Sequence, residues 1–337
     1  MYRSSVGKRA LLRRLSAGSA LLLGSTVLSA CSGSEDTDDD PAGGGSQAPR
    51  GSGLVAIITP SPDNPLFATE ADAAAAKAEE LGYETSVTSH DDDPNKQSQL
   101  IDAAISKRAV AVVLDNVGPD ASIGPVQKAV DAGIPVFLLD GELNADGIAT
   151  GQIVSDDVQG ARLGARAFVE AMGEEGAYAE LTGAASDRDA EVRSDGYQDV
   201  ISQYPDLELV AQQTADGNRQ EAISAVERLI RRHPDLEGVI AGNDTMALGA
   251  VAALKAADQT DVVVVGFDGS PEAIAAIKDG TMHATVLQPA AQMAELAVEQ
   301  AHDVITTGQT AEPERQSVAC EVVTARNAND YGVFGPA

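Results

Sequence analysis

From Gly53 onwards the chain alternates short apolar runs with amphipathic stretches, and this alternation limits the possible folds more than any other feature. Leu54–Ile58 is a continuous apolar run, which is typical of a strand buried on both faces. Between Phe67 and Leu81 apolar residues recur at helical spacing, and Gly82 follows as a C-terminal cap. Repetition of this unit predicts an α/β fold in which helices cover both faces of parallel sheets.

The same pattern continues to the last quarter of the chain, and its length suggests two domains with one sheet each. The strands expected after the first are residues 84–88, 110–114, 136–139, 148–154, 178–182, 207–213, 239–241, 262–267, 284–287 and 318–323. The helices expected after the first are residues 94–107, 123–132, 158–172, 191–203, 219–232, 246–257, 271–278 and 291–306.

Residues 1–30 have the composition of an export signal. Basic residues come first, and an apolar stretch over Leu15–Val27 follows, too short and too interrupted by glycine to span a bilayer. Leu28-Ser29-Ala30-Cys31 looks like a bacterial lipobox, in which the chain is cut before the cysteine and the thiol is lipidated. We therefore expect Cys31 to be a lipid anchor on the outer side of the cell membrane.

Residues 31–53 are rich in Gly, Ser and Asp, which is typical of a flexible tether. Such a tether holds a soluble body near the membrane through the lipid anchor alone. The whole chain has 52 acidic and 23 basic residues and a formal net charge of −29. That charge repels phosphate, and aromatic residues make up only 3%, so nucleic-acid binding is excluded.

Polar side chains gather where the expected strands end. In open α/β sheets, ligands bind beyond the carboxyl ends of strands. Carboxylate, amide and guanidinium groups can donate and accept hydrogen bonds in pairs, which suits adjacent hydroxyls of a sugar or polyol, with an aromatic ring on its C–H groups. The candidate ligand-binding residues are Asn64, Phe67, Asp140, Arg193, Asn243, Asp268 and Gln288.

Several of these residues also have structural explanations. Asp140 and Asp268 could form caps or turns, and Asp244 is expected to be the N-cap of the helix that follows. Arg193 could be a surface ion-pair partner, and Phe67 could belong to the core.

Five segments carry a family resemblance, and they keep its order along residues 54–325. The chain resembles the periplasmic binding proteins of the ribose-binding (type I) family, which supply sugars to ABC importers. The matching segments are Asn64–Phe67, Ile134–Asp140, Gly242–Gly249, Val264–Gly269 and Ala284–Gln288.

The resemblance implies that the seven candidate residues contact the ligand. It also marks three departures from the ribose-binding pattern. Leu66 and Gly217 stand where aromatic rings are expected, and Gly141 stands where an arginine is expected. We therefore expect a neutral pentose, hexose or polyol other than D-ribose, with Glu142 or Asn144 replacing the polar group lost at Gly141.

The resemblance also implies two doubly wound parallel-sheet lobes joined by a three-segment hinge, with the ligand between them. The closed form would dock on the permease subunits of the importer, and a monomer is expected. The expected first lobe is residues 54–155 plus 289–312, the second is 156–288 plus 313–325, and 326–337 form a tail. The chain would cross between lobes near Ser155–Asp157, Gln288–Pro289 and Glu312–Gln316.

Other functions fit less well. A sugar-responsive repressor would need a basic DNA-binding N-terminus, whereas a receptor lipoprotein that passes ligand occupancy to a membrane sensor remains the alternative. No P-loop, His-Glu-x-x-His or Cys-x-x-Cys motif is present, so no enzyme and no cofactor are expected. The four histidines lack metal-ligand spacing, and no metal is expected. His90–Asp93 could suggest a cation site but is expected to be an exposed polar loop, and Cys320 is expected to be buried.

Overall fold

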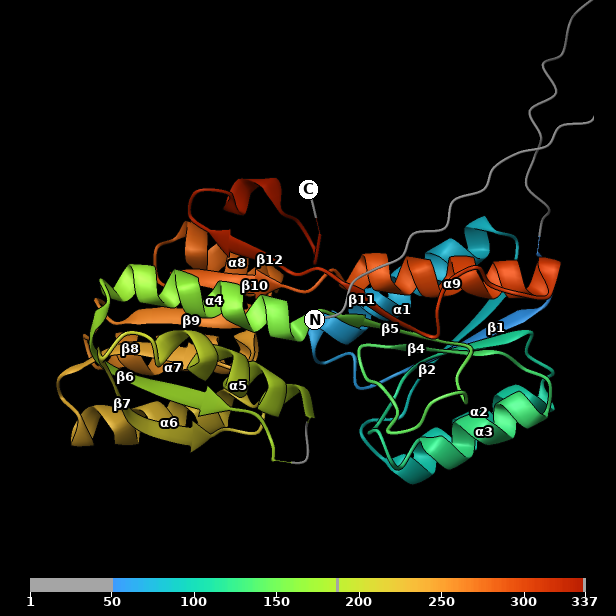
Figure 1. Ribbon diagram of the computed structural model, residues 1–337, viewed down its shortest axis with the longest axis horizontal. Coiled ribbons are helices and arrows are strands. Elements are labelled where there is room, and N and C mark those ends of the chain that lie inside the picture. The colour runs from blue at the N-terminus through green and yellow to red at the C-terminus, as the bar shows by residue number, and fades with distance from the viewer. Residues whose placement is uncertain (1–50, 186–187, 336–337) are drawn as a thin grey trace, which may run out of the picture. The chain divides into compact units, whose positions relative to one another are not determined.

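The computed structural model describes residues 51–185 and 188–335. The export signal, Cys31 and nearly all of the tether lie outside these residues. The described part contains two six-stranded sheets with helices on both faces of each (Figure 1). No helix in it is long and apolar enough to cross a membrane.

The first sheet is wholly parallel, with strand order β11-β5-β4-β3-β1-β2. Alternate residues of β1 face opposite layers: Val55 and Ile57 pack against α1 and α9, whereas Ala56 and Ile58 pack against α2 and α3. The strands are β1 (Leu54–Thr59), β2 (Glu84–Ser89), β3 (Ala111–Asp115), β4 (Val136–Leu139), β5 (Gly151–Ser155) and β11 (Arg315–Val318). The helices are α1 (Pro65–Glu80), α2 (Pro94–Ser106), α3 (Ile123–Asp131) and α9 (Ala290–Thr307).

The second sheet has the order β12-β10-β9-β8-β6-β7 and is parallel except for β12, which runs antiparallel to β10. Ile240 faces α4 and α5, whereas Val239 and Ala241 face α6 and α7. The strands are β6 (Glu175–Thr182), β7 (Asp206–Thr214), β8 (Leu236–Ala241), β9 (Val263–Asp268), β10 (Ala284–Leu287) and β12 (Glu321–Thr324). The helices are α4 (Asp157–Met172), α5 (Arg188–Ile201), α6 (Arg219–Arg232), α7 (Asp244–Ala256) and α8 (Pro271–Lys278).

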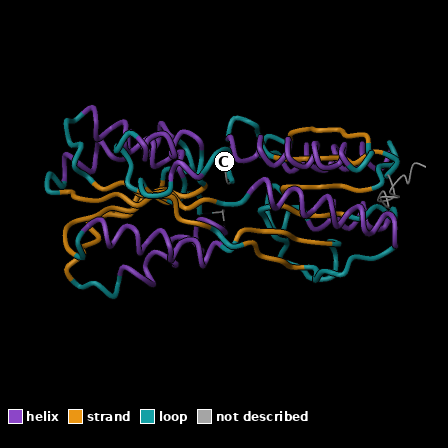
Figure 2. The backbone as a smooth tube through the Cα atoms, turned by 90° about the horizontal axis from the view of Figure 1, so that it is seen from above, coloured by secondary structure: helices purple, strands orange, loops and turns teal. Residues whose placement is uncertain are grey.

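Figure 2 shows the strands of the second sheet running between layers of helices, as the doubly wound prediction requires. The prediction of two parallel-sheet α/β lobes is confirmed. The chain passes between the sheets three times, at Ser155–Asp157, at Leu287–Ala290 and at Val318–Glu321.

The third passage differs from the expectation. Residues 318–323 were expected to be one strand of the second lobe, with the crossing at Glu312–Gln316. Instead Arg315–Val318 pairs with β5 in the first sheet, and Glu321–Thr324 pairs with β10 in the second. The apolar run is divided because its two halves complete the edges of different sheets.

Candidate ligand-binding site

Arg193, on α5, is buried in a cage of acceptors. Its Nε donates to Asp157 Oδ2 at 2.7 Å, and its Nη1 donates to the carbonyl oxygen of Gly242 at 3.1 Å. Nη1 also lies 3.6 Å from Asp268 Oδ1, and the guanidinium carbon lies 4.1 Å from the centre of the Phe267 ring. The alternative of a surface ion pair is therefore wrong.

The charge of this guanidinium is fixed by its neighbours. Burial alone would lower the pKa of Arg193, but the carboxylates of Asp157 and Asp268 raise it well above its ordinary value. The charge of Asp140, which follows β4 of the first sheet, also raises the pKa of Arg193. Charged groups from both lobes therefore interact electrostatically at this site.

Gln288 extends the same network to the chain passages. Its Nε2 donates to Asp268 Oδ1 at 2.9 Å, and its Oε1 lies 2.7 Å from the hydroxyl of Ser155. The Ser155 hydroxyl also lies 2.5 Å from Asp157 Oδ1, and its single proton can serve only one of the two acceptors at a time. Two of the three passages between the sheets are thus linked by hydrogen bonds next to Arg193.

Asp268 is the last residue of β9 and lies at a positive φ of 117°. Burial raises the pKa of its carboxyl, whereas the charge of Arg193, whose Nη1 lies 3.6 Å from Oδ1, lowers this pKa and favours the carboxylate form. Asp244 nearby is also buried, and it accepts hydrogen bonds from the Ser270 amide and the Thr285 hydroxyl. Asp244 is therefore not the N-cap expected from the sequence.

The cap of α7 is Asn243, whose Oδ1 accepts from the Met246 amide at 2.9 Å. This geometry occupies the carbonyl side of the amide and leaves its Nδ2 pointing near Gly217. A Cβ atom built on Gly217 would lie 3.3 Å from that Nδ2. A side chain at position 217 would therefore crowd the amide of Asn243, and glycine avoids this contact.

Two candidates from the first sheet lie at the start of α1. Asn64 caps this helix, since its Oδ1 accepts from the Leu66 amide at 3.0 Å. Phe67 is half-buried and packs on a small apolar cluster of Leu66, Ala290 and Phe334. Phe67 thus contacts the core and keeps part of its ring exposed.

Asp140 follows β4 at a φ of 58°, and it stands beside two acidic residues that the sequence analysis passed over. One carboxylate oxygen of Asp140 lies within 4.8 Å of oxygens from Glu70 and Asp115. Glu70 comes one helical turn after Phe67, and Asp115 is the last residue of β3. The spacing from Phe67 and the end of the strand were the available sequence signals for these two residues.

The suggested substitutes for the polar group missing at Gly141 are engaged elsewhere. Glu142 Oε1 pairs with Arg315 at 2.8 Å, and Asn144 donates to Asp120 at 3.1 Å. Gly141 itself is close to Asn116, whose Nδ2 donates to the Gly141 carbonyl at 2.8 Å.

His90 does not belong to an exposed loop. It is fully buried, its Nδ1 lies 3.1 Å from the Asp92 amide, and its Nε2 lies 2.9 Å from the Asp115 carbonyl oxygen. Because the amide can only donate, Nδ1 is the acceptor and Nε2 carries the proton. His90 therefore holds the end of β3 in place. Cys320 is buried as expected, and burial raises the pKa of its thiol.

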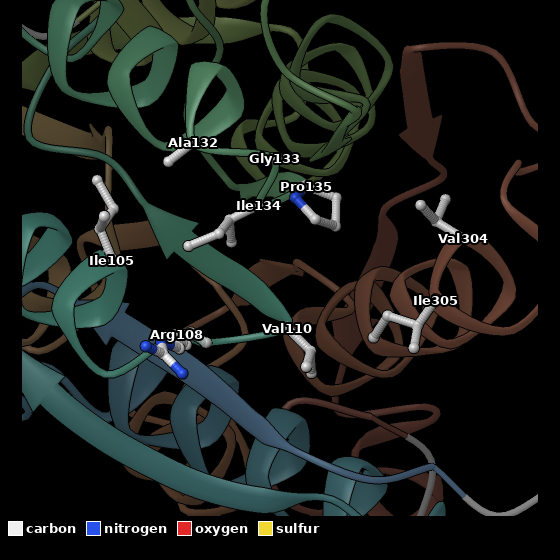
Figure 3. A pocket seen from close by; sticks show the side chains of 10 residues that line it. Ile105, Arg108, Val110, Ala132, Gly133, Ile134, Pro135, Val304 and Ile305 are labelled. Atoms are coloured by element: carbon white, nitrogen blue, oxygen red, sulfur yellow. The ribbon is translucent and has the colours of Figure 1, made fainter.

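A surface pocket lies at the amino-terminal ends of β3 and β4, at the opposite end of the strands from the candidate site. It is lined mainly by aliphatic side chains, among them Val110 and Ile134, which precede β3 and β4 (Figure 3). Its lining offers few hydrogen-bonding groups to a hydroxyl-rich molecule. The candidate site is instead the set of polar groups at the carboxyl ends of the strands.

The buried carboxyl of Asp244 makes the stability of the folded protein depend on pH, and this dependence can be tested. Burial raises the pKa of Asp244 to about 7, above an unfolded value of about 3.9. Its contribution to stability is therefore complete below about pH 4 and is lost as the pH rises toward about 7. We expect Asp244→Asn to remove this part of the dependence, because the amide can still accept from Ser270 and donate to Thr285.

Urea unfolding of both proteins between about pH 5 and pH 8 measures the effect, which cannot exceed about 1.4 kcal/mol per pH unit for one group. A difference in unfolding free energy that stays constant with pH would contradict the assignment.

The comparisons with known proteins agree on one family. A family model described as a periplasmic binding protein domain matches residues 55–310. The D-apiose import binding protein of Paraburkholderia graminis is 55% identical over 281 residues, which cover 83% of this chain and 90% of that protein. The ribose import binding protein of Escherichia coli is 32% identical over 251 residues, covering 74% and 84%.

Solved structures give the same result. A periplasmic solute-binding protein of an ABC transporter from Actinobacillus succinogenes, with bound D-allose, has a TM-score of 0.79 and 28% identity, and the match covers 83% of this chain and all of that one. A solute-binding protein from Mycobacterium smegmatis, with bound glycerol, has a TM-score of 0.78 and 30% identity, covering 85% and 100%. This is a family of solute-binding proteins rather than enzymes, and the chain belongs to it as a periplasmic binding protein of type I fold.

Proposed function

We propose that this chain is an extracytoplasmic substrate-binding lipoprotein of an ABC importer, and that it binds a neutral monosaccharide or polyol between its two lobes. The observation that carries the proposal is the buried network of Arg193, Asp268 and Gln288 at the carboxyl ends of strands. It presents a fixed cation, a carboxyl group and an amide together, which can bind neighbouring hydroxyl groups through paired hydrogen bonds. A carboxylate ligand would meet Asp140 and Asp268, so a neutral ligand is favoured.

D-Apiose is the first ligand to test. Two relatives that are more than half identical to this chain, from Paraburkholderia graminis and Actinobacillus succinogenes, are named D-apiose import binding proteins. Gly141, Gly217 and Leu66 stand where the ribose-binding pattern has an arginine and two aromatic rings. The loss of these three groups favours a ligand whose shape differs from D-ribose.

A thermal-shift and calorimetry panel of D-apiose, D-ribose, D-allose, xylitol, myo-inositol and glycerol tests the proposal. A bound ligand at 100 times its Kd should stabilise the folded state by about 2.7 kcal/mol. We expect D-apiose to give the largest effect. A response to D-ribose alone would contradict the proposed ligand class, and no response to any neutral sugar or polyol would contradict the function.

Closure of the lobes on the ligand is proposed to create the surface that the permease subunits recognise, because a ligand that contacts both lobes binds the closed state better than the open one. The lipid anchor is proposed at Cys31 from its lipobox-like context. Mass spectrometry of the N-terminus of the exported chain tests it, and an unmodified Cys31 in the membrane fraction would contradict it.

Asn243 and Asn218 offer a matched test of the site. Both cap a helix through Oδ1, at α7 and α6 respectively, so each alanine substitution should cost about 1 kcal/mol of stability. Only Asn243 lies beside Arg193, through its neighbour Gly242. We expect Asn243→Ala to weaken sugar binding at least about tenfold and Asn218→Ala to leave it unchanged. Equal affinities of the two variants would remove Asn243 from the site.

A further inference from the structure

Glu70 and Asp115 are two acidic residues that protein contacts alone do not satisfy. Glu70 has no exposed surface, and neither of its carboxylate oxygens accepts a hydrogen bond from the residues that the structure describes. Asp115 is 4% exposed, and its Oδ2 is equally without a donor in the described part of the chain. Leaving a buried polar group unpaired costs about 1–3 kcal/mol, and more for a charged one.

The surrounding charges make this cost larger. Asp140 lies against both residues, Asp189 adds to the field at Asp115, and Asp268 adds to the field at Glu70. Within the described residues, no lysine or arginine forms an ion pair with Glu70 or Asp115. Burial first, and then these neighbouring charges, raise the pKa of both carboxyls. Glu70 and Asp115 can hydrogen-bond to each other only if one of them keeps its proton.

The backbone nevertheless holds this pair firmly at the candidate site. Glu70 lies one turn after Phe67 on α1. Asp115 is the last residue of β3, and Asp140 directly follows the neighbouring strand β4. His90 donates to the Asp115 carbonyl oxygen, and Gln97 accepts from the Val117 amide just beyond it. A rigid, donor-poor set of carboxyl oxygens beside Phe67 and Asp140 is suited to a molecule that brings hydrogen-bond donors.

We propose that Glu70 and Asp115 form a carboxyl pair that binds hydroxyl groups of the sugar on the side of Asp140, and that this pair selects among neutral sugars by the hydroxyls they present there. The inference rests on the proposed function, because it assigns the pair to the same ligand. The bound hydroxyls supply the donors that the described residues do not provide at the unpartnered oxygens of the pair. The preference for one sugar over another then comes from whether its hydroxyls reach both carboxyl groups.

Calorimetry on the full chain with Glu70→Leu and Asp115→Asn, using D-apiose, D-ribose, D-allose and glycerol, tests the pair. We expect each variant to bind the preferred sugar of the wild-type protein at least about 100-fold more weakly, and to lose most of the preference among sugars. Glu70→Leu should also keep or raise the stability in urea, because an apolar side chain replaces an unpaired buried carboxyl. Asp115→Asn keeps the shape of the site if the leucine variant fails to fold.

Glu180→Gln is the matched control. Glu180 is a buried glutamate on β6 whose Oε2 already accepts from Gln198 and Gln212, so its change should leave sugar affinities unaltered.

The outcomes separate this inference from the proposed function. If the wild-type protein binds none of the sugars, both fail. If it binds one of them and the Glu70 and Asp115 variants keep its affinity and preference, the pair is only structural and this inference alone is overturned. A loss of wild-type binding in EDTA that Ca²⁺ restores would also overturn it, because the three carboxyls would then hold a cation rather than hydroxyl groups.

Discussion

Replacement of Arg193 by alanine is expected to abolish most of the stabilisation that the ligand gives to the folded protein. The guanidinium is held between Asp157 and Asp268 and lies over the Phe267 ring, so it is presented in one orientation. A planar group fixed in this way can donate to two hydroxyl oxygens at once without losing further side-chain entropy. The expected loss is most of the roughly 2.7 kcal/mol that ligand at 100 times its Kd supplies.

The same substitution should also destabilise the protein without ligand. Removal of one partner from a buried ion pair leaves the other charge uncompensated, which costs about 3–5 kcal/mol. Asp157 and Asp268 would both lose their cation, and Gln288 would have to compensate at Asp268 alone.

The measurement must therefore compare unfolding free energies with and without sugar, so that the ligand effect is separated from the loss of stability. Arg162→Ala is the control, because Arg162 forms an exposed pair with Asp199 between α4 and α5, and such pairs contribute about 0–1 kcal/mol. If Arg193→Ala keeps the wild-type increment with sugar, Arg193 is a structural residue and the site assignment is wrong.

The strand ends that carry this site could be predicted from the sequence, because each apolar run stops where the chain leaves the sheet. Asp140 and Asp268 follow or end such runs, and the topology places them at the carboxyl ends of two sheets. Their place in the structure agrees with the prediction, whereas their role in binding stays a prediction.

The errors have a different origin. In Asn243-Asp244 either residue is a good cap, but Asn243 caps α7 while Asp244 accepts hydrogen bonds from the Ser270 amide and the Thr285 hydroxyl. The run 318–323 resembles one strand, because no local sequence signal marks the point where the chain leaves the first sheet after Val318 and enters the second at Glu321. In both cases the deciding contacts come from distant parts of the chain.

Buried charge was the property that the sequence could not reveal. Glu70 lies in an alanine-rich helix beside Thr69 and close to Asp72, and by composition it belongs to a solvated face. His90 precedes three aspartates and looks equally exposed. Both residues are buried because α1 and the β2–α2 connection pack onto the end of β3. This packing joins distant segments, so a local sequence pattern does not predict it.

Substitution of Gly269 by alanine is the second change with a large expected effect. Gly269 lies at a φ of +79° between Asp268 and Ser270, and a Cβ atom there would come within 2.7 Å of the Leu287 Cα. The left-handed conformation costs a residue with a side chain about 1 kcal/mol. The clash with the Cα atom and side chain of Leu287 adds about 1–3 kcal/mol, because β10 lies inside the sheet and cannot move away freely.

Gly280 separates these two contributions. It lies at a φ of +75° after α8, and a Cβ atom built there meets nothing within 4 Å. Gly280→Ala should therefore lose only about 1 kcal/mol, whereas Gly269→Ala should lose about 2–4 kcal/mol in urea unfolding. The displaced strand would also carry Gln288 away from Asp268, so we expect Gly269→Ala alone to weaken sugar binding. Equal losses of stability in the two variants would show that β10 yields to the added methyl group, and that the contact between Gly269 and Leu287 does not hold Asp268 against Gln288.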